Sequence, residues 1–170
     1  MNLIVAVDQN WGIGYQNDLL FHIPEDMRFF KEHTMGKTVV MGERTLKSLP
    51  GGKPLAGRVN IVLSDDPAFC VQDVTVVRSL PELFCALRAY EEEDIFVIGG
   101  GMVYRTLLPY CTRAYITKVQ ASKQYDTAIP NLDALSAWQI EQCSEPHEHQ
   151  GLCFRFVTYR NTQIKERSYE

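Results

Sequence analysis

The sequence predicts an α/β fold: a single-domain, three-layer sandwich in which helices cover both faces of a mostly parallel, eight-stranded sheet. Three observations support this prediction. The 170 residues are close to the length of one domain. Short apolar runs alternate with helical segments as far as Pro109, as in a parallel sheet that is buried on both faces. Beyond Pro109 the strands follow one another without helices, which predicts an antiparallel edge with a C-terminal hairpin strand.

The strands are predicted from runs of β-branched and other apolar residues. The buried parallel strands are expected at residues 3–7, 38–41, 59–63, 74–77 and 95–98. The later strands are expected at residues 113–120, 138–144 and 152–159, with residues 145–151 as the loop of the terminal hairpin. We therefore expect one domain over residues 1–162. The tail, residues 163–170, is polar and is expected to fray because no apolar face anchors it.

Helix boundaries are predicted from residues that cap or end helices. Ser79 and Glu82 form a capping box, in which the hydroxyl and the carboxylate each bind a free backbone N–H group. A helix is therefore expected to start there and to run to Tyr90. Another helix is expected to begin near Pro24, whose fixed φ suits a first turn, and to end at Gly36.

Composition and charge exclude several classes of function. The 17 basic and 21 acidic residues leave a net charge of −4, which gives no general attraction to nucleic acid or to anionic membranes. The apolar run at residues 3–7 is too short for a membrane span or a secretion signal, so a cytoplasmic protein is expected. No exposed apolar stripe is evident, so a monomer is expected.

Disulfide, metal and triad chemistry are not expected either. The 5 cysteines are odd in number and form no C-x-x-C pair, which fits reduced packing thiols. His147 and His149 flank Glu148 in the expected hairpin loop, where a solvated turn is more common than a two-ligand metal site. No nucleophile stands in the motif of a serine or cysteine triad.

Two glycine clusters resemble the dinucleotide fingerprint without matching it. Residues 12–14 and 99–101 each lack the third glycine of G-x-G-x-x-G. The run at 99–101 follows a buried strand and precedes an apolar helix at 103–108, a junction that directs backbone N–H groups toward an anion. A tight turn is the structural alternative, but three consecutive glycines favour phosphate.

A third strand end has a similar pattern. It reads Met41-Gly42-Glu43-Arg44-Thr45, and Arg44 and Thr45 could hold phosphate oxygens there. A solvated helix face explains a Glu-Arg pair equally well. Both interpretations stay open on the residues alone.

Asp26 is the most informative charged residue. On a helix that begins near Pro24, it shares one face with Phe30 and Thr34, and Met27 lies beside it. Large apolar neighbours exclude water from a carboxylate and raise its pKa, which suits it to acid chemistry or to binding a ligand through two N–H donors. The alternative is a first-turn acid that points to water, which is the commoner role of an isolated helix acid.

Taken in their order along the chain, these motifs resemble those of the dihydrofolate reductase family, in its bacterial form. The resemblance extends from Leu3 to about Arg160. The matching blocks are Ile4-Val5-Ala6-Val7-Asp8 with Gly12-Ile13-Gly14, Ile23-Pro24-Glu25-Asp26-Met27, Val40-Met41-Gly42 with Thr45, residues 55–64, Val97-Ile98-Gly99-Gly100-Gly101 with Val103-Tyr104, and Thr117. Each block is weak alone, but their shared order and spacing are specific.

The resemblance implies hydride transfer from NADPH to the pterin ring of 7,8-dihydrofolate, which gives tetrahydrofolate. Asp26 would accept hydrogen bonds from the pterin 2-amino group and N3–H and favour protonation of N5, with Thr117 as its orienting partner. Tyr104 would lie near the nicotinamide and the pterin, and Phe21 would pack in the same site. Antifolate inhibitors would bind this pocket.

The resemblance also assigns the binding residues. Arg58 would bind the glutamate α-carboxylate through its planar fork. The substrate pocket would further include Ile4, Val5, Met27, Phe30, Leu49, Leu55 and Ile98. The cofactor would contact Ala6, Ile13, Gly14, Leu19, Gly42, Glu43, Arg44, Thr45, Leu63, Ser64, Asp65, Arg78, Gly99, Gly100, Gly101, Met102, Val103 and Tyr104.

The cofactor positions depart from the family's usual pattern. Glu43 and Met102 stand where relatives often carry basic residues for the 2′-phosphate. This weakens the preference for NADPH over NADH, so NADH is not excluded. Arg44 or Arg78 would have to compensate.

Two further departures concern the substrate side. Leu20-Phe21 stands where many bacterial relatives have Pro-Trp, so an indole N–H that could order water near the pterin is absent. Tyr125 stands where a relative has glycine, which affects how the loop at residues 14–20 closes.

Two other functions are compatible with parts of the sequence. A riboflavin-pathway reductase would keep the fold and act on a ribosylated pyrimidine, but Asp26 and Arg58 suit a pterin and a glutamate tail. A nucleotide-binding regulatory module without catalysis is supported only by Phe21 and Glu43. The presence of Asp26 and Thr117 in register argues against it.

Overall fold

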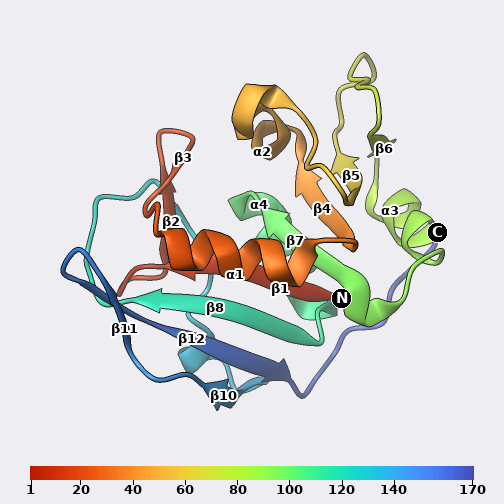
Figure 1. The fold of residues 1–170 in the computed structure, drawn as a ribbon. Helices are drawn as coiled ribbons and strands as arrows, with labels where there is room; N and C mark the ends of the chain where they lie inside the picture. Colours follow the sequence, from red (N-terminus) through yellow and green to blue (C-terminus); the bar gives the residue numbers. More distant parts are fainter.

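The computed structural model describes all 170 residues and confirms the predicted α/β fold (Figure 1). The main sheet has the strand order β10-β12-β8-β1-β7-β4-β5-β6. The bounds are β1 Asn2–Val7, β4 Thr38–Gly42, β5 Val59–Leu63, β6 Thr75–Val77, β7 Ile95–Gly99, β8 Arg113–Val119, β10 Trp138–Cys143 and β12 Leu152–Asn161. A ninth strand, β11 His147–His149, pairs with β12 inside the expected hairpin loop, because the long β12 offers it a free edge.

The direction of the strands locates the edge of the sheet where ligands can bind. Every pair from β8 through β1, β7, β4 and β5 to β6 is parallel, whereas β12 is antiparallel to both β8 and β10. The carboxyl ends of β1, β7, β4 and β5 therefore lie along one edge. In open parallel sheets, ligands bind outside this edge.

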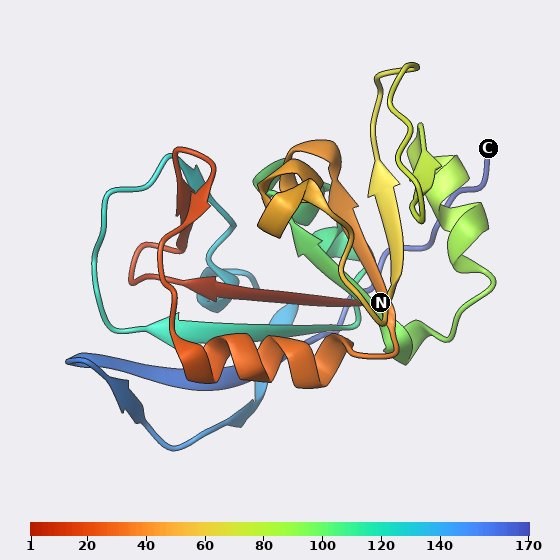
Figure 2. The same ribbon diagram turned by 45° about the horizontal axis from the view of Figure 1, so that its top comes forward.

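Four α-helices cover the two faces of the sheet. They are α1 Pro24–Thr34, α2 Glu43–Ser48, α3 Leu80–Leu87 and α4 Gly101–Leu107. One core contains Leu3, Val40, Ile61 and Val97 with side chains of α3 and α4. The opposite core contains their neighbours Ile4, Val39, Val62 and Phe96 with side chains of α1 and α2. Successive strand residues thus face two different cores, which is why these strands are apolar throughout; Figure 2 shows α1 alongside β1 and β8.

The predicted helix starts are confirmed, and one end differs. α1 begins at Pro24 and is followed by Gly36 at φ +76°. Ser79 Oγ accepts a 3.3 Å hydrogen bond from the Glu82 N–H, as in a capping box, whereas Glu82 Oε2 accepts from the N–H of Arg78 in place of that of Ser79. The helix α3 ends at Leu87 rather than at Tyr90, because the last residues form tighter, three-residue turns. None of the helices has the length and apolar character needed to cross a membrane.

A second, small sheet was not predicted from the sequence. It has the order β3-β2-β9, with bounds β2 Gly12–Tyr15, β3 Asp18–Leu19 and β9 Thr127–Ala128. Gln16 and Asn17 both have positive φ, as the tight turn between β2 and β3 requires. Asp126 Oδ2 accepts a 2.9 Å hydrogen bond from the Gln16 N–H, which ties this hairpin to the loop before β9. Short 3₁₀ turns complete the fold at Pro50–Gly52, Glu92–Asp94, Leu108–Tyr110 and Leu132–Ala134.

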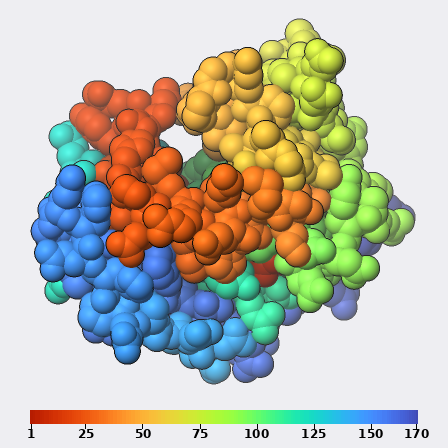
Figure 3. Space-filling view, in the orientation of Figure 1, coloured from red at the N-terminus to blue at the C-terminus, as the bar shows by residue number.

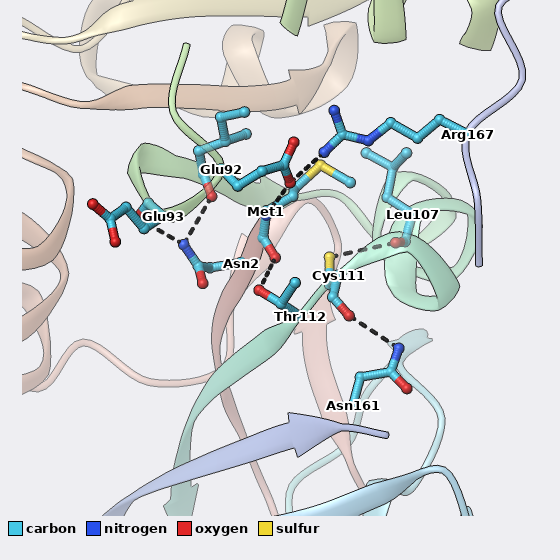
Figure 4. A network of polar contacts seen from close by, with 10 residues as sticks. Met1, Asn2, Glu92, Glu93, Leu107, Cys111, Thr112, Asn161 and Arg167 are labelled. Carbon is cyan, nitrogen blue, oxygen red and sulfur yellow. Dashed lines mark hydrogen bonds and ion pairs between the residues drawn. The ribbon is translucent and has the colours of Figure 1, made fainter. Parts of the chain in front are cut away.

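The tail lies against the body of the protein, which differs from the frayed tail expected from its polarity. Arg167 Nη2 donates a 2.6 Å hydrogen bond to Glu92 Oε2, which also binds the amino group of Met1 at 2.8 Å (Figure 4). The guanidinium of Arg88 on the C-terminal side of α3 lies 3.8 Å from the ring centroid of Tyr169. Ion pairs and cation–π contacts therefore anchor the tail in place of an apolar face.

Candidate active site

The Asp26 side chain turns inward from the first turn of α1. Its Oδ1 accepts a 2.6 Å hydrogen bond from Oγ1 of Thr117 in β8, and Thr117 is only 2% exposed. Burial raises the pKa of Asp26 above its ordinary value, and the bond from Thr117 acts against this shift. An acid that simply points to water does not match this geometry. The arrangement suits a carboxyl group that binds a ligand and takes part in proton transfer.

Tyr104 connects α4 with the first strand beside this carboxylate. Its phenol donates a 2.8 Å hydrogen bond to the Ile4 carbonyl, and the side chain is buried. Burial and the negative charge of Asp26 both raise the pKa of Tyr104, so the phenol stays protonated. Tyr104 therefore lies within the electrostatic field of Asp26 and can act as a fixed hydrogen-bond donor.

Arg58 lies on the loop before β5, and three contacts fix its surroundings. Its Nε donates to Ala56 O at 3.0 Å, and its Nη1 donates to Thr34 Oγ1 at the end of α1 at 3.1 Å. The buried side-chain amide of Asn60 accepts from the Leu55 N–H and donates to the carbonyls of Leu55 and Arg58, which shapes this loop. The guanidinium is thus held in place, with Nη2 left free of protein partners.

Most of the predicted apolar walls gather in one core. Those that pack there together are Ile4, Phe30, Leu49, Leu55 and Ile98. The Val5 side chain faces the opposite core, so only its backbone can reach a ligand on this side. Met27 is 60% exposed on α1. Phe21 belongs to a third cluster, at the start of α1.

Glycines allow close packing where β4 and β7 end side by side. A Cβ atom at Gly100 would lie 3.2 Å from Thr45 Oγ1, and one at Gly42 would lie 3.2 Å from Val103 Cγ2. Gly99, which precedes a cis peptide bond, has φ +134°. The space-filling view shows a hollow between the β2–β3 hairpin and α2, with α4 and β7 at its base (Figure 3). The glycines therefore let the ends of β4 and β7 pack closely against α2 and α4. The hollow lies at the carboxyl edge of the sheet, where open parallel sheets bind ligands.

Comparison with known proteins identifies the family. The family model for dihydrofolate reductase matches residues 1–161. The chain belongs to the dihydrofolate reductase family. It is 38% identical over 159 residues to the dihydrofolate reductase of Neisseria gonorrhoeae, covering 94% of this chain and 96% of that protein. It is 39% identical over 140 residues to the dihydrofolate reductase of Bacillus subtilis (strain 168), covering 82% of this chain and 80% of that protein.

A solved structure agrees with the sequence relatives. Dihydrofolate reductase from Enterococcus faecalis, complexed with NADP(H) and RAB-propyl, has a TM-score of 0.83 and 31% sequence identity to this chain. The match covers 94% of this chain and 95% of the enterococcal one. The chain is therefore an enzyme of the dihydrofolate reductase type, and the bacterial relatives support the bacterial form.

Arg44 and Arg78, the two arginines expected to compensate for Glu43, have different surroundings. Arg78 is committed to the loop after β5, since its guanidinium donates to the carbonyls of Asp66 and Phe69. Glu43 Oε1 is buried without a hydrogen-bond partner, and Lys47 Nζ is 3.7 Å away. Arg44 is exposed on the same short helix.

The loop before β9 brings another charge to this side of the reductase. Hydrogen bonds from the Gln16 N–H and the Thr127 hydroxyl lower the pKa of Asp126, and the positive charge of Arg44 contributes to the shift. Arg44 is exposed and makes no hydrogen bond within the protein, whereas Nη1 and Nη2 of Arg78 each donate to a loop carbonyl.

The other predicted cofactor residues fall into two groups. Those at the carboxyl edge of the sheet or in its loops include Ala6, Leu63, Ser64, Asp65, Gly101, Met102 and Val103. Ser64 is buried and its hydroxyl already accepts from the Asp66 N–H, whereas Met102 is 74% exposed. The hairpin group consists of Ile13, Gly14 and Leu19, where Ile13 is buried in a core and Leu19 is exposed.

Sequence reasoning missed one polar residue that organises the site. The carboxylate of Asp8 is buried at the end of β1, where Oδ1 accepts from the N–H groups of Asn10 and Gly12 at 2.9 and 2.8 Å. Its Oδ2 accepts from the Lys123 N–H at 3.0 Å. The available signal was an acid directly after an apolar strand. The structure brings no three His, Cys, Asp or Glu side chains together as metal ligands.

Proposed function

We propose that this chain reduces 7,8-dihydrofolate to 5,6,7,8-tetrahydrofolate with NADPH. The observation that carries the proposal is the inward-facing Asp26 carboxylate, held by Thr117 beside an apolar wall. The match to the dihydrofolate reductase family supports the reaction, and NADP(H) in the enterococcal relative supports the cofactor. The same pocket would take antifolate inhibitors.

The protein's residues would act on the pterin in three ways. Asp26 accepts hydrogen bonds from the pterin 2-amino group and N3–H, since Oδ2 has no partner within the protein, and thereby favours protonation of N5. The protonated phenol of Tyr104 holds the Ile4 carbonyl in place. Ile4 and Phe30, which belong to one apolar core, exclude water from the reacting ring.

The cofactor would lie along the carboxyl edge of the sheet. NADPH supplies the hydride when it is bound. Residues 99–103 and 42–45 would hold it, because they lie at the ends of β7 and β4, on the carboxyl edge where ligands bind in open parallel sheets. Arg44 provides positive charge for a phosphate on this path.

The proposal is tested by mixing purified protein with dihydrofolate and NADPH. The absorbance of the reduced nicotinamide is expected to fall only when both are present, with tetrahydrofolate as the product. The same assay with NADH measures the cofactor preference. If neither reduced nicotinamide is consumed with dihydrofolate, the proposed function is wrong.

Glu43→Gln is expected to strengthen NADPH binding by about fivefold to tenfold and to change NADH binding by less than about twofold. A carboxylate at this edge of the sheet, which has only a 3.7 Å contact with Lys47 and no hydrogen bond at Oε1, repels an additional phosphate. About 1 kcal/mol of repulsion changes the dissociation constant by about fivefold. Dissociation constants from nicotinamide fluorescence measure this. Glu91→Gln, an exposed and remote acid, is the matched control. An unchanged NADPH:NADH ratio in Glu43→Gln would show that Glu43 does not face the cofactor.

We also propose that residues 1–162 are the catalytic domain and act as a cytoplasmic monomer. All the proposed site residues come from one chain, and the family model ends at residue 161. Removing residues 163–170 is expected to leave kcat and KM within about twofold. The loss of the Arg167–Glu92 and Arg88–Tyr169 contacts is expected to lower the melting temperature by a few degrees, since about 1 kcal/mol corresponds to about 2–4 °C at this size. A truncated protein that is folded but inactive would contradict this assignment.

A further inference from the structure

Lys123 joins three segments that are distant in the sequence. Its Nζ donates a 2.7 Å hydrogen bond to the Leu20 carbonyl, and the ammonium lies 4.8 Å from the centroid of the Phe21 ring. Its backbone N–H donates to the buried carboxylate of Asp8 at the end of β1. The side chain and the backbone of one residue thus connect β1, the loop after β8 and the segment before α1.

These three segments carry the residues proposed to bind the pterin. The segment at residues 20–23 leads directly into α1, whose first turn holds Asp26. The loop that contains Lys123 follows β8, which holds Thr117. A displacement between the start of α1 and β8 would therefore change the hydrogen bond between Asp26 and Thr117.

Phe21 lies against the same face of β8 as Thr117. Phe21 is buried and belongs to an apolar cluster with Val119, which is two residues beyond Thr117 in the strand. Side chains two residues apart in a strand project to the same side. The orientation of the Phe21 ring is thus coupled to the part of β8 that binds Asp26.

The Leu20 carbonyl depends on Lys123 for its hydrogen bond. No backbone N–H donates to this carbonyl. A second hollow, distinct from the one beside α2, lies between the β2–β3 hairpin and Lys123 and Gln124. Its volume is about 520 Å³, and Leu20 lies on its wall. No other side chain donates a hydrogen bond to this carbonyl. No carboxylate forms an ion pair with its ammonium, so the contacts to Leu20 and Phe21 account for its position.

We propose that Lys123 is a positioning residue for dihydrofolate reduction. It fixes the Leu20–Phe21 peptide and the Phe21 ring, and through them the angle at which α1 presents Asp26 to Thr117 and to the pterin. This inference depends on the proposed function. The alternative is a surface lysine that has no role in catalysis and contributes little to stability, as is usual for exposed charges.

The test compares Lys123→Met, which keeps the length of the side chain and loses the donor and the charge, with Lys123→Arg, which keeps both. Lys165→Met is the matched control, because Lys165 also lies over an aromatic ring, 5.4 Å from the centroid of Tyr110, and is remote from the site. Steady-state kcat and KM, the dissociation constants of folate and NADPH, and melting temperatures are measured for each variant.

Lys123→Met is expected to lower kcat about tenfold and to weaken folate binding about threefold to tenfold, with NADPH binding within about twofold of the wild type. Lys123→Arg is expected to restore kcat to within about threefold, and Lys165→Met to leave kcat and KM unchanged. A merely structural role would lower the melting temperature of Lys123→Met without lowering kcat, and that result would overturn the inference. An inactive wild-type protein would instead refute the proposed function, so the two failures are distinguishable.

Discussion

Replacing Asp26 with asparagine is expected to lower kcat/KM for dihydrofolate by about 10³-fold at pH 7, within the range that positioned acids and bases contribute. Asparagine keeps the shape of the side chain and can still accept the bond from Thr117. It cannot supply the negative charge that binds two N–H donors and promotes protonation of N5. The nicotinamide absorbance assay measures the loss.

Glu25→Gln is the matched control for this substitution. Glu25 is the neighbouring acid of the same helical turn. Its carboxylate lies 3.2 Å from Nδ1 of His147, and so it does not point into the pocket. Its replacement is expected to change kcat/KM by less than about twofold. If Asp26→Asn retained activity within about threefold of the wild type at pH 7, Asp26 would be the wrong acid.

Asp26→Asn is also expected to stabilise the fold at neutral pH. Burial raises the pKa of Asp26 in the folded state above its ordinary value of 3.8, so the folded state binds the proton more tightly than the unfolded chain does. The free energy of unfolding therefore falls as the pH rises through the interval between the two pKa values, and ionised Asp26 is destabilising above it.

Thermal unfolding at two pH values checks this sign. At pH 7 the melting temperature of Asp26→Asn is expected to exceed that of the wild type, by about 2–4 °C for each kcal/mol gained. The difference is expected to shrink as the pH falls below the ordinary carboxyl pKa, where Asp26 is protonated in both states. A variant that is less stable at pH 7 would show that the ionised carboxylate, with its bond from Thr117, stabilises the fold.

The main sheet could be predicted because each of its central strands is buried on both sides. At residues 3–4, 39–40 and 61–62, successive side chains enter opposite cores, so the strands appear in the sequence as continuous apolar runs. The small sheet could not be predicted in this way. Its strands are short and partly polar, and the contact that fixes its hairpin joins Gln16 to Asp126, which are 110 residues apart.

The site could be predicted where the chemistry of a side chain decides its role. It is harder to predict where the role depends on which neighbour the side chain contacts. The order of the motifs correctly brings Asp26 to Thr117. Val5 is predicted to bind the substrate, and because its side chain faces the other core, only its backbone can do so. Arg78 has the charge for a phosphate, and its hydrogen bonds to two loop carbonyls are contacts that no motif indicates. Contacts between loops, such as that of Lys123 with Leu20, leave no pattern in the sequence.

Replacing Arg58 with alanine is expected to weaken dihydrofolate binding about 100-fold. Nε and Nη1 are held by Ala56 O and Thr34 Oγ1, so the guanidinium is fixed while Nη2 is available to the glutamate α-carboxylate. Burial lowers the pKa of Arg58, but a guanidinium stays charged at pH 7. Hydrogen bonds between charged groups contribute about 1.5–3 kcal/mol, and the upper part of this range corresponds to about 100-fold in affinity.

A pterin without a glutamate tail separates this anchoring role from an effect on folding. Its affinity for Arg58→Ala is expected to change by less than about threefold, because Asp26 and the apolar wall are left intact. Arg58→Lys, which keeps the charge but loses the planar fork, is expected to lie between alanine and the wild type for dihydrofolate. Equal losses for both ligands would mean that the loop of Leu55 to Arg58, shaped by Asn60, has changed its structure. Arg58 would then support the pocket without binding the carboxylate.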